Sequence, residues 1–416
     1  MTRPARWLAV ALTLAAPARA ETLREALAQA WAGNPALAAA RARQEALAQT
    51  PEQARAAGRL TAAATGDARY DDLGYGRAAT AGVNAALPIF TGGRVPAAVR
   101  AATADVAAGA QGLRDTEAAV LEQVVAVYAG LLFSQQAVDV AHVGIARLDR
   151  QVEESRSRFG LGQSTLTDVA QLEAQRASIV ANLADAEGAL ATAQAAYRAI
   201  VGRDAGTLAS EGDTAPVLPR TLADARAAAE EASPLLLANR RVLDASAARI
   251  DLARADGAPA LDLTGGYGRG IRSADGGWRG FAFEGNAGVT LRVPLLTGGL
   301  VAARVRQAQA NWRADRFAVD AAAREAVRGA DSAWAALTAA NTRLAAGIEG
   351  LKAADLALKG VRAEYGFGLR STIDILIADQ SFRAAQLDVA RARSDVLVAQ
   401  AGLLRATGRM TPAAYR

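Results

Sequence analysis

The sequence predicts a mainly α-helical protein with a small β-section, built from two copies of one structural plan. Three features support this: an internal repeat, regions in which apolar and polar residues alternate, and long stretches with an apolar residue at every seventh position. About a quarter of the 416 residues are alanine, and only 5% are aromatic. This composition is typical of long packed helices rather than of a thick globular core.

The first twenty residues have the pattern of a cleaved secretory signal peptide. Arg3 and Arg6 form a basic start, an apolar stretch follows over 7–16, and Ala-Arg-Ala at 18–20 matches a cleavage motif. Cleavage after Ala20 would remove three arginines and lower the formal net charge from +5 to +2. The nearly neutral mature chain gives no reason to expect nucleic acid as a partner.

The chain has no cysteine and one histidine, His142. Disulfides, thiolate nucleophiles and a lipid-modified N-terminal cysteine are therefore excluded. His142 has no second histidine to share a metal, so we expect no metal and no other cofactor. The glycine-rich residues 265–270 lack the lysine and following helix of a phosphate-binding loop. We expect no enzyme, because coiled-coil hairpins offer no pocket of convergent acid and base groups.

Comparison of the chain with itself reveals the two copies. Pro35 recurs 199 residues later as Pro234, and from Pro88 onward the displacement is 206 residues. The second copy therefore holds seven extra residues, whose best place is a loop over the polar, glycine-rich residues 273–280. The predicted organisation is a signal peptide over 1–20, a first repeat over 21–203, a linker over 204–220, a second repeat over 221–409 and a tail over 410–416.

Each copy is predicted to contain one helix, two strands and two long helices. The helices are expected over 22–55, 94–159 and 164–200, and over 221–256, 300–365 and 371–406. The strands are expected over about 59–70, 77–88, 260–271 and 280–294. Thr22 and Thr221 are suited to cap the first helix of each copy. A proline and two glycines form a structural hinge between strand and long helix in each copy, at Pro88, Gly92, Gly93, Pro294, Gly298 and Gly299.

The predicted strands alternate between apolar and polar residues. Phe283, Val289 and Leu291, for example, alternate with Glu284 and Thr290. This pattern gives a sheet one apolar and one polar face. Runs of about ten residues with aromatic residues near their ends have the length of tilted membrane-spanning strands. A soluble two-layer sheet would show the same alternation.

Four strands per chain cannot close a barrel, and hydrocarbon does not tolerate an open sheet edge. Strands that span a membrane must therefore come from several chains. Two chains give a barrel of eight strands, and side chains fill the interior of a barrel of that size. Three chains give twelve strands and leave room for a lumen. We therefore expect a homotrimer.

The seven-residue spacing defines the long helices. Over 94–159 the apolar ladder consists of Val124, Leu131, Val138, Ile145, Val152 and Phe159. Such ladders specify coiled-coil packing, and a helix of this length would extend about 100 Å. Sharp turns are expected at the two hairpin tips, which are formed by Gly160, Leu161 and Gly162 and by Gly366, Phe367 and Gly368.

Together these features resemble the TolC family of trimeric outer-membrane channel proteins over nearly the whole mature chain. The resemblance rests on the repeat, the hairpin tips, the junctions Leu87–Gly93 and Val293–Gly299, and the segment Ala406–Arg409. It implies a twelve-stranded barrel in the lipid of the bacterial outer membrane and a periplasmic tunnel of twelve helices. It also implies that the tips dock onto a periplasmic adaptor protein, which joins the channel to an inner-membrane transporter of the ABC or RND type.

The resemblance further implies a gate at the tips. Tyr365, Arg370 and Asp374 match gate residues of the second hairpin, and Thr167 and Asp168 match their partners on the first. In the implied closed state Tyr365 hydrogen-bonds Asp168, and Arg370 bridges to Thr167 or Asp168 of a neighbouring hairpin. The alternative is that Asp168 and Asp374 are first-turn carboxylates favoured by the helix dipole.

The expected function is a passive exit duct, because the chain has no nucleotide motif to drive transport itself. Residues 50–55 and 404–411 look most like the branch of the family that serves type I protein secretion. Small-molecule efflux is the alternative cargo, and a periplasmic coiled-coil scaffold is the alternative from another class. Ile377 stands where the family often has a second acidic residue after Asp374, which leaves the ion selectivity open.

Overall fold

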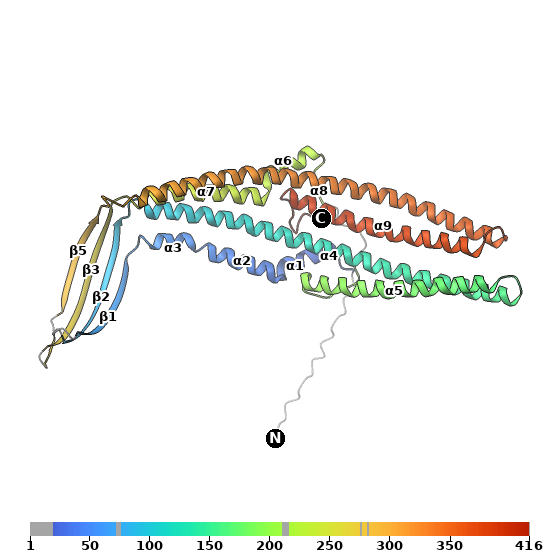
Figure 1. The fold of residues 1–416 in the computed structure, drawn as a ribbon, viewed down its shortest axis with the longest axis horizontal. Helices are drawn as coiled ribbons and strands as arrows, with labels where there is room; N and C mark the ends of the chain where they lie inside the picture. The colour runs from blue at the N-terminus through green and yellow to red at the C-terminus, as the bar shows by residue number, and fades with distance from the viewer. Residues whose placement is uncertain (1–19, 72–75, 210–215, 275–276, 281–282, 416) are drawn as a thin grey trace, which may run out of the picture. The chain divides into compact units, whose positions relative to one another are not determined.

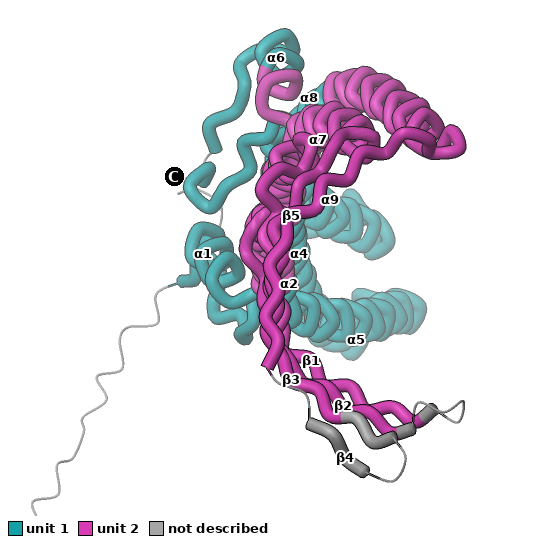
Figure 2. The backbone as a smooth tube through the Cα atoms, turned by 90° about the vertical axis from the view of Figure 1, so that its left-hand side faces the viewer, with its two compact units in different colours: residues 1–37, 117–227, 329–416 teal, residues 38–116, 228–328 magenta. Residues whose placement is uncertain are grey.

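The computed structural model describes residues 20–71, 76–209, 216–274, 277–280 and 283–415. The predicted signal peptide, apart from Ala20, lies outside these residues. The chain divides into two compact units, shown in Figure 2. Unit 1 comprises residues 1–37, 117–227 and 329–416, and unit 2 comprises residues 38–116 and 228–328.

The described residues form helices and strands in the order shown in Figure 1. The helices are α1 (Leu23–Gly33), α2 (Pro35–Leu47), α3 (Thr50–Ala56), α4 (Arg94–Gly160), α5 (Leu166–Val201), α6 (Leu222–Ala232), α7 (Pro234–Ala255), α8 (Leu300–Gly366) and α9 (Thr372–Ala406). The strands are β1 (Thr61–Asp71), β2 (Gly76–Phe90), β3 (Ala260–Ala274), β4 (Gly277–Gly280) and β5 (Glu284–Arg292).

The four long helices begin and end within two residues of the positions expected from the sequence. Helices α4 and α8 each contain 67 residues and occupy equivalent positions in the two repeats. Thr22 caps α1, and its hydroxyl accepts a hydrogen bond from the Glu25 amide. Thr221 accepts the same bond from the Asp224 amide at the start of α6. The expected threonine caps are therefore present.

The first helix of each repeat is not continuous, contrary to the sequence prediction. Residues 22–55 form three helices instead of one, and residues 221–256 form two. One break in each repeat precedes Pro35 or Pro234, which occupy equivalent positions and stand first in α2 and α7. The second break within 22–55 lies at residues 48–49, before α3, which has Pro51 in its first turn. A proline lacks the N–H for the preceding turn and forces the residue before it out of the helical conformation. Asn34 caps the new helix through a 2.8 Å bond from the Ala36 amide to its side-chain oxygen.

Unit 2 contains an antiparallel sheet. The strands pair in the order β1, β2, β3, and both β4 and β5 then pair with β3. β4 pairs with the end of β3 near Ala274 and β5 pairs with its beginning, so together they occupy one strand position. The register of β2 against β3 shifts between Pro88 and Phe90, where Pro88 has no N–H to donate.

The prediction of a loop over residues 273–280 was wrong. Residues 273–274 belong to β3 and residues 277–280 form β4, which pairs with β3 from Ile271 to Ala274. Polar residues and glycines often indicate a loop, but paired strands satisfy the backbone groups of such residues regardless of their side chains. The extra residues of the second repeat therefore lengthen a hairpin.

Short ion pairs join the helices within unit 2. Arg100 of α4 donates to Asp251 of α7 at 2.9 Å, and Arg249 of α7 donates to Asp105 of α4 at 2.6 Å. The Gln44 amide of α2 donates to the Val106 carbonyl of α4 at 3.0 Å. These exposed arginines pair with neighbouring helices, as expected for solvated helix faces.

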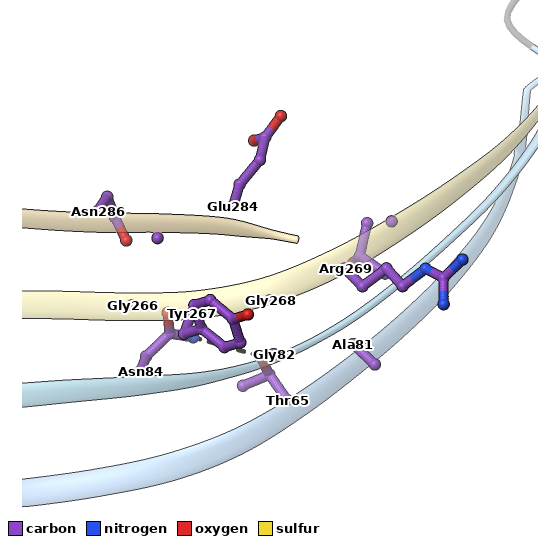
Figure 3. A pocket seen from close by; sticks show the side chains of 13 residues that line it. Thr65, Ala81, Gly82, Asn84, Gly266, Tyr267, Gly268, Arg269, Glu284 and Asn286 are labelled. Carbon is purple, nitrogen blue, oxygen red and sulfur yellow. Dashed lines mark hydrogen bonds between the residues drawn. The ribbon is translucent and has the colours of Figure 1, made fainter. Parts of the chain in front are cut away.

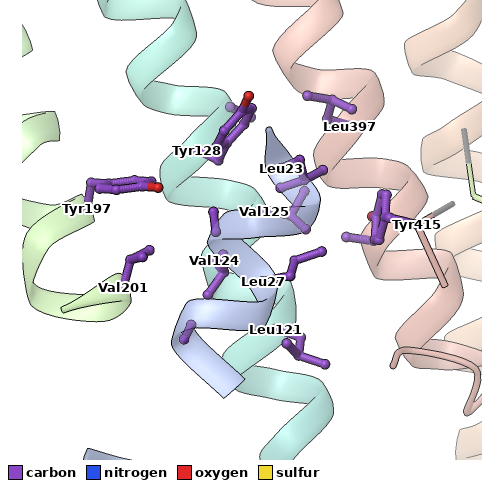
Figure 4. Packing of buried hydrophobic residues seen from close by; sticks show 14 of the residues in the cluster. Leu23, Leu27, Leu121, Val124, Val125, Tyr128, Tyr197, Val201, Leu397 and Tyr415 are labelled. Atoms are coloured by element: carbon purple, nitrogen blue, oxygen red, sulfur yellow. The ribbon is translucent and has the colours of Figure 1, made fainter. Parts of the chain in front are cut away.

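Side chains of α1, α4, α5, α9 and the C-terminal tail form the apolar core of unit 1 (Figure 4). Leu27, Leu121, Val124, Tyr197 and Tyr415 are almost completely buried in it. Among the described helices, α4 alone is long and apolar enough to cross a membrane, and 44% of that stretch is buried. Since α4 supplies much of this core, the stretch is consistent with a core helix.

Candidate functional site

The two hairpin tips of unit 1 have the same backbone geometry. Gly162 and Gly368 have φ angles of +73° and +75°, a conformation that favours glycine. The Gln163 amide donates to the Arg158 carbonyl at 2.8 Å, and the Leu369 amide donates to the Glu364 carbonyl at 2.9 Å. Helices α4 and α8 therefore each end in a Schellman-type turn that satisfies their last carbonyls.

The helix after each tip begins with a reciprocal capping box. Thr165 and Asp168 cap α5, and Ser371 and Asp374 cap α9. The Thr165 amide donates to the Asp168 carboxylate at 3.0 Å, and the Ser371 amide donates to the Asp374 carboxylate at 2.9 Å. Both carboxylates thus fill the first-turn role considered from the sequence.

These contacts favour the charged form of both carboxylates. The Thr165 hydroxyl and then the Thr165 amide lower the pKa of Asp168, to which the Thr372 hydroxyl of the second hairpin also contributes. The Ser371 amide and then its hydroxyl lower the pKa of Asp374. Asp168 therefore contacts both hairpins of one chain.

The remaining predicted gate residues lie at the tips with other partners. The Arg370 Nε donates to Glu364 at 2.7 Å, which raises the pKa of the guanidinium. The Tyr365 ring lies 5.2 Å below the Arg158 guanidinium. Thr167 is exposed on the first turn of α5. In the described single chain, no hydrogen bond joins Tyr365 to Asp168 or Arg370 to Thr167.

Apolar side chains are exposed at both tips. Leu161, Phe367 and Leu369 are 74%, 82% and 74% exposed. Ile377, one turn beyond Asp374, is also exposed. The tips therefore present apolar surface beside charged side chains, and a single chain leaves this surface uncovered.

A cavity of about 260 Å³ lies behind the tips, between the two hairpins. Arg158 and Gln151 of α4, Arg362 and Tyr365 of α8 and Thr372 line it. Polar groups of both hairpins therefore line the cavity.

Asp379 of α9 is a functional candidate that the sequence reasoning missed. It is 1% exposed and forms ion pairs with arginines of α4, α8 and α9. Seven-residue steps from Asp379 reach Gln386, Arg393 and Gln400, so the heptad pattern marks it as a polar position of α9. The sequence offered no signal for its burial, because its arginine partners come from α4 and α8 as well as from α9.

The sheet of unit 2 has two different faces. Val83 pairs with Tyr267, and Leu263 pairs with Val289, so these four residues share one apolar face. All four are exposed, and the Tyr267 ring stacks on Phe283 at 5.5 Å. An exposed apolar sheet face of this kind is typical of a strand surface that contacts lipid.

The other face is polar and rich in glycine (Figure 3). Asn84 pairs with Gly266, which pairs with Asn286, and the Asn84 amide donates to Thr65 at 3.3 Å. A Cβ at Gly266 would lie within 3 Å of both asparagine side-chain oxygens. Glycines and amides line the hollow in this face together with three larger side chains, those of Tyr267, Arg269 and Glu284.

Comparison with known proteins decides the family. Residues 26–203 and 226–409 match the family described as outer membrane efflux protein. The outer membrane efflux protein BepC of Brucella suis is 32% identical over 337 residues, which cover 81% of this chain and 74% of BepC. The chain belongs to the outer membrane efflux protein family. The resemblance to TolC-type channels is thereby confirmed, and the protein is an outer-membrane protein rather than an enzyme.

Two further relatives are named as an outer membrane protein and as a protease secretion protein. The outer membrane protein TolC of Vibrio cholerae is 29% identical over 302 residues, which cover 71% of this chain and 69% of TolC. The alkaline protease secretion protein AprF of Pseudomonas aeruginosa is 23% identical over 289 residues, which cover 68% of this chain and 60% of AprF.

Solved structures show the same fold. The outer membrane protein VceC of Vibrio cholerae matches with a TM-score of 0.75 at 22% identity, covering 93% of this chain and 96% of VceC. CusC, whose structures concern transmembrane channel formation, matches with a TM-score of 0.78 at 19% identity, covering 93% and 92%. The outer membrane efflux fold thus extends over nearly the whole chain.

Proposed function

We propose that this protein is the exit duct of a tripartite export system and assembles as a homotrimer. The sheet carries the proposal, since one of its faces is apolar and exposed. In the described residues, β1 pairs with β2 alone and β5 pairs with β3 alone. Both edges of the described sheet therefore lack a neighbouring strand. Three chains with four strand positions each supply the twelve strands of a barrel with an open lumen. The helices of the three chains would then form the periplasmic tunnel.

Cell fractionation tests the channel against a periplasmic scaffold. We expect the protein in the outer-membrane fraction, as a trimer that survives mild detergent and dissociates on heating. Recovery in the soluble periplasm without such a trimer would favour the scaffold.

Within this function, we propose that the cargo is protein, exported by type I secretion. The support is the similarity of residues 50–55 and 404–411 to that branch, together with the relative AprF, a protease secretion protein. Small-molecule efflux is the second candidate, because BepC is named an efflux protein and FusA of Burkholderia cepacia, 30% identical over 219 residues, a fusaric acid resistance protein.

Complementation separates the two cargo classes. The chain would be expressed in a strain that lacks its own exit duct and carries either a type I secretion transporter or an efflux pump. Restored release of the secreted protein, without restored drug resistance, supports secretion. Restored resistance alone supports efflux.

We further propose that Arg370 and Asp168 close the tunnel at the tips. Arg370 and Thr167 are exposed in the single chain, so both are available to a neighbouring hairpin. A link from a guanidinium to a carboxylate is directional and can be broken without unfolding the helix. Tyr365 and Asp374 complete the polar entrance, and Pro88, Gly92, Gly93, Pro294, Gly298 and Gly299 serve as hinges between barrel and helices.

Single-channel recording tests the gate. Replacement of Arg370 by Ser, or of Asp168 by Ala, should raise the conductance of the reconstituted trimer. Arg343→Ser is the matched control, because Arg343 forms an exposed ion pair with Asp395 on the same hairpin. Unchanged conductance in the Arg370 and Asp168 variants would refute the assigned roles.

The partners would be a periplasmic adaptor at the tips and an inner-membrane transporter of the ABC or RND type. The exposed Leu161 and Phe367 offer the adaptor an apolar contact beside Gly160, Gly162, Gly366 and Gly368. Photo-cross-linking from position 367 should capture the adaptor, whereas cross-linking from the exposed position 356 of α8 should not.

A further inference from the structure

A charge cluster around the buried Asp379 joins the two hairpins of unit 1 behind the tips. Asp379 of α9 accepts hydrogen bonds from Arg362 of α8 at 3.3 Å and from Arg383 of α9 at 2.9 Å. Arg147 of α4 approaches the same carboxylate, with its Nη1 3.8 Å from Oδ1. One buried carboxylate therefore faces three guanidinium groups, from three helices.

Arg147 is the member that belongs to the first hairpin. Its Nη1 is buried and has no hydrogen-bond partner among the described residues. Its guanidinium lies 5.4 Å from the Phe382 ring of α9, which provides a second contact with the second hairpin. Charge and ring contacts, rather than a directional hydrogen bond, therefore hold Arg147 against the second hairpin.

The surrounding residues leave room for this arrangement. A Cβ at Gly144, one turn before Arg147, would lie 3.0 Å from the Arg383 Cδ. The Gln151 side-chain oxygen, one turn after Arg147, is buried without a partner in the described part of the chain. On α4, Arg147 is therefore flanked by a glycine that leaves space for Arg383 and by a buried amide oxygen without a partner.

We propose that Asp379 is a clasp that holds the second hairpin against the first within each chain and restrains opening of the channel. The inference rests on the proposed function and adds a restraint that is separate from the tip gate. Asp379 neutralises arginines on both hairpins, so its loss leaves three neighbouring cations that repel one another across α4, α8 and α9. Because the central Asp379 carboxylate is buried, salt screens these links less than the exposed tip pairs.

Neutral substitutions in the full-length protein test the clasp. In planar bilayers, Asp379→Asn should raise the open-state population at least about tenfold, since breaking a buried charge link removes a strong restraint. Arg147→Gln, which removes only the link to the first hairpin, should act in the same direction. Asp395→Asn is the matched control, because Asp395 lies on the same helix and pairs with the exposed Arg343 of α8.

Hydrogen–deuterium exchange of the purified protein provides a measurement that does not depend on conduction. Asp379→Asn and Arg147→Gln should speed exchange in peptides over 141–155 and 372–383, and Asp395→Asn should not. Unchanged exchange and conductance in both clasp variants, with only a lower unfolding temperature, would overturn the clasp. If the unaltered protein formed no channel while exchange changed as expected, the proposed function would fail and the clasp between hairpins would stand.

Discussion

Glu21 shows how one buried residue organises the core of unit 1. Its carboxylate accepts hydrogen bonds from the Tyr197 hydroxyl at 2.5 Å and from Arg203 at 2.6 Å. Its amide donates to the Thr207 carbonyl at 2.7 Å. Burial, and then the Glu21 carboxylate, raise the pKa of Tyr197, so the hydroxyl remains a donor at neutral pH.

Tyr197→Phe should lower the free energy of unfolding by about 1–3 kcal/mol, because it leaves a buried carboxylate without one donor. Denaturant unfolding measures the change. Arg328→Gln is the control, since it removes only an exposed pair with Glu325 and should have no measurable effect. Equal stabilities of Tyr197→Phe and the unaltered protein would contradict the role of this bond.

The capping carboxylates give a second prediction at the residue scale. A lowered pKa in the folded state stabilises the protein above the ordinary aspartate pKa near 4, and this contribution is lost as the pH falls through the lowered value. The double variant Asp168→Asn and Asp374→Asn should therefore be less stable than the unaltered protein at neutral pH. This difference should shrink below about pH 4.

Thermal unfolding across pH measures that difference directly. Glu349→Gln, at an exposed pair with Lys352, serves as the control. A stability difference that stays constant from pH 7 to strongly acidic conditions would show that the two aspartates do not act as charged caps. The position of Asp168 one turn beyond the tip allowed a first-turn carboxylate to be predicted, whereas the partners of Asp379 come from helices distant in the sequence.

At the scale of elements, the sequence predicted the long helices, which depend on periodicity. It did not predict the helix breaks and the β3–β4 hairpin, which depend on single residues. The seven-residue ladders located all four long helices, because coiled-coil packing requires an apolar residue at each turn of the seam. The breaks at Pro35 and Pro234 were missed although both prolines marked the repeat. The β3–β4 hairpin was missed because glycine and polar residues are compatible with either a loop or a paired strand.

The hinge glycines provide a matched pair at this scale. Gly92 and Gly298 have φ angles of +61° and +58° and occupy equivalent positions. A Cβ at Gly92 would lie 2.5 Å from the Ala258 Cβ and 2.9 Å from the Pro259 oxygen, whereas a Cβ at Gly298 meets nothing within 4 Å. Both positions have a left-handed backbone, but only Gly298 has room for a Cβ.

Gly298→Ala should therefore cost about 1–2 kcal/mol of stability, the penalty of a left-handed conformation. Gly92→Ala should cost clearly more, because the backbone near Ala258 must also move. Chemical unfolding of the two variants provides the comparison. Equal losses would mean that the contact with Ala258 does not constrain this hinge.

At the scale of the whole molecule, the sheet explains why a single chain is incomplete. The alternation predicted one apolar and one polar face, and the register places Val289 on the first and Asn286 on the second. Alternation could not distinguish a membrane barrel from a soluble sheet. The family match made that distinction, since no feature of one chain supplies the neighbouring strands.

Val289→Arg should reduce assembly of the membrane trimer, because an arginine on the lipid face costs about 2–4 kcal/mol near the bilayer centre. Asn286→Arg is the matched variant on the polar face and should assemble nearly normally. The fraction of heat-dissociable trimer on gels reports the outcome. Similar assembly of both variants would contradict the assignment of the faces.

The proposed assembly is a gated duct of three copies of this chain through the outer membrane. Single-channel recording of the purified, unaltered protein in a planar bilayer is the decisive test. We expect discrete current steps of low conductance, which grow when the tip link is removed by Arg370→Ser. A bilayer that remains silent with correctly folded trimer, for both the unaltered protein and the Arg370 variant, would contradict this proposal.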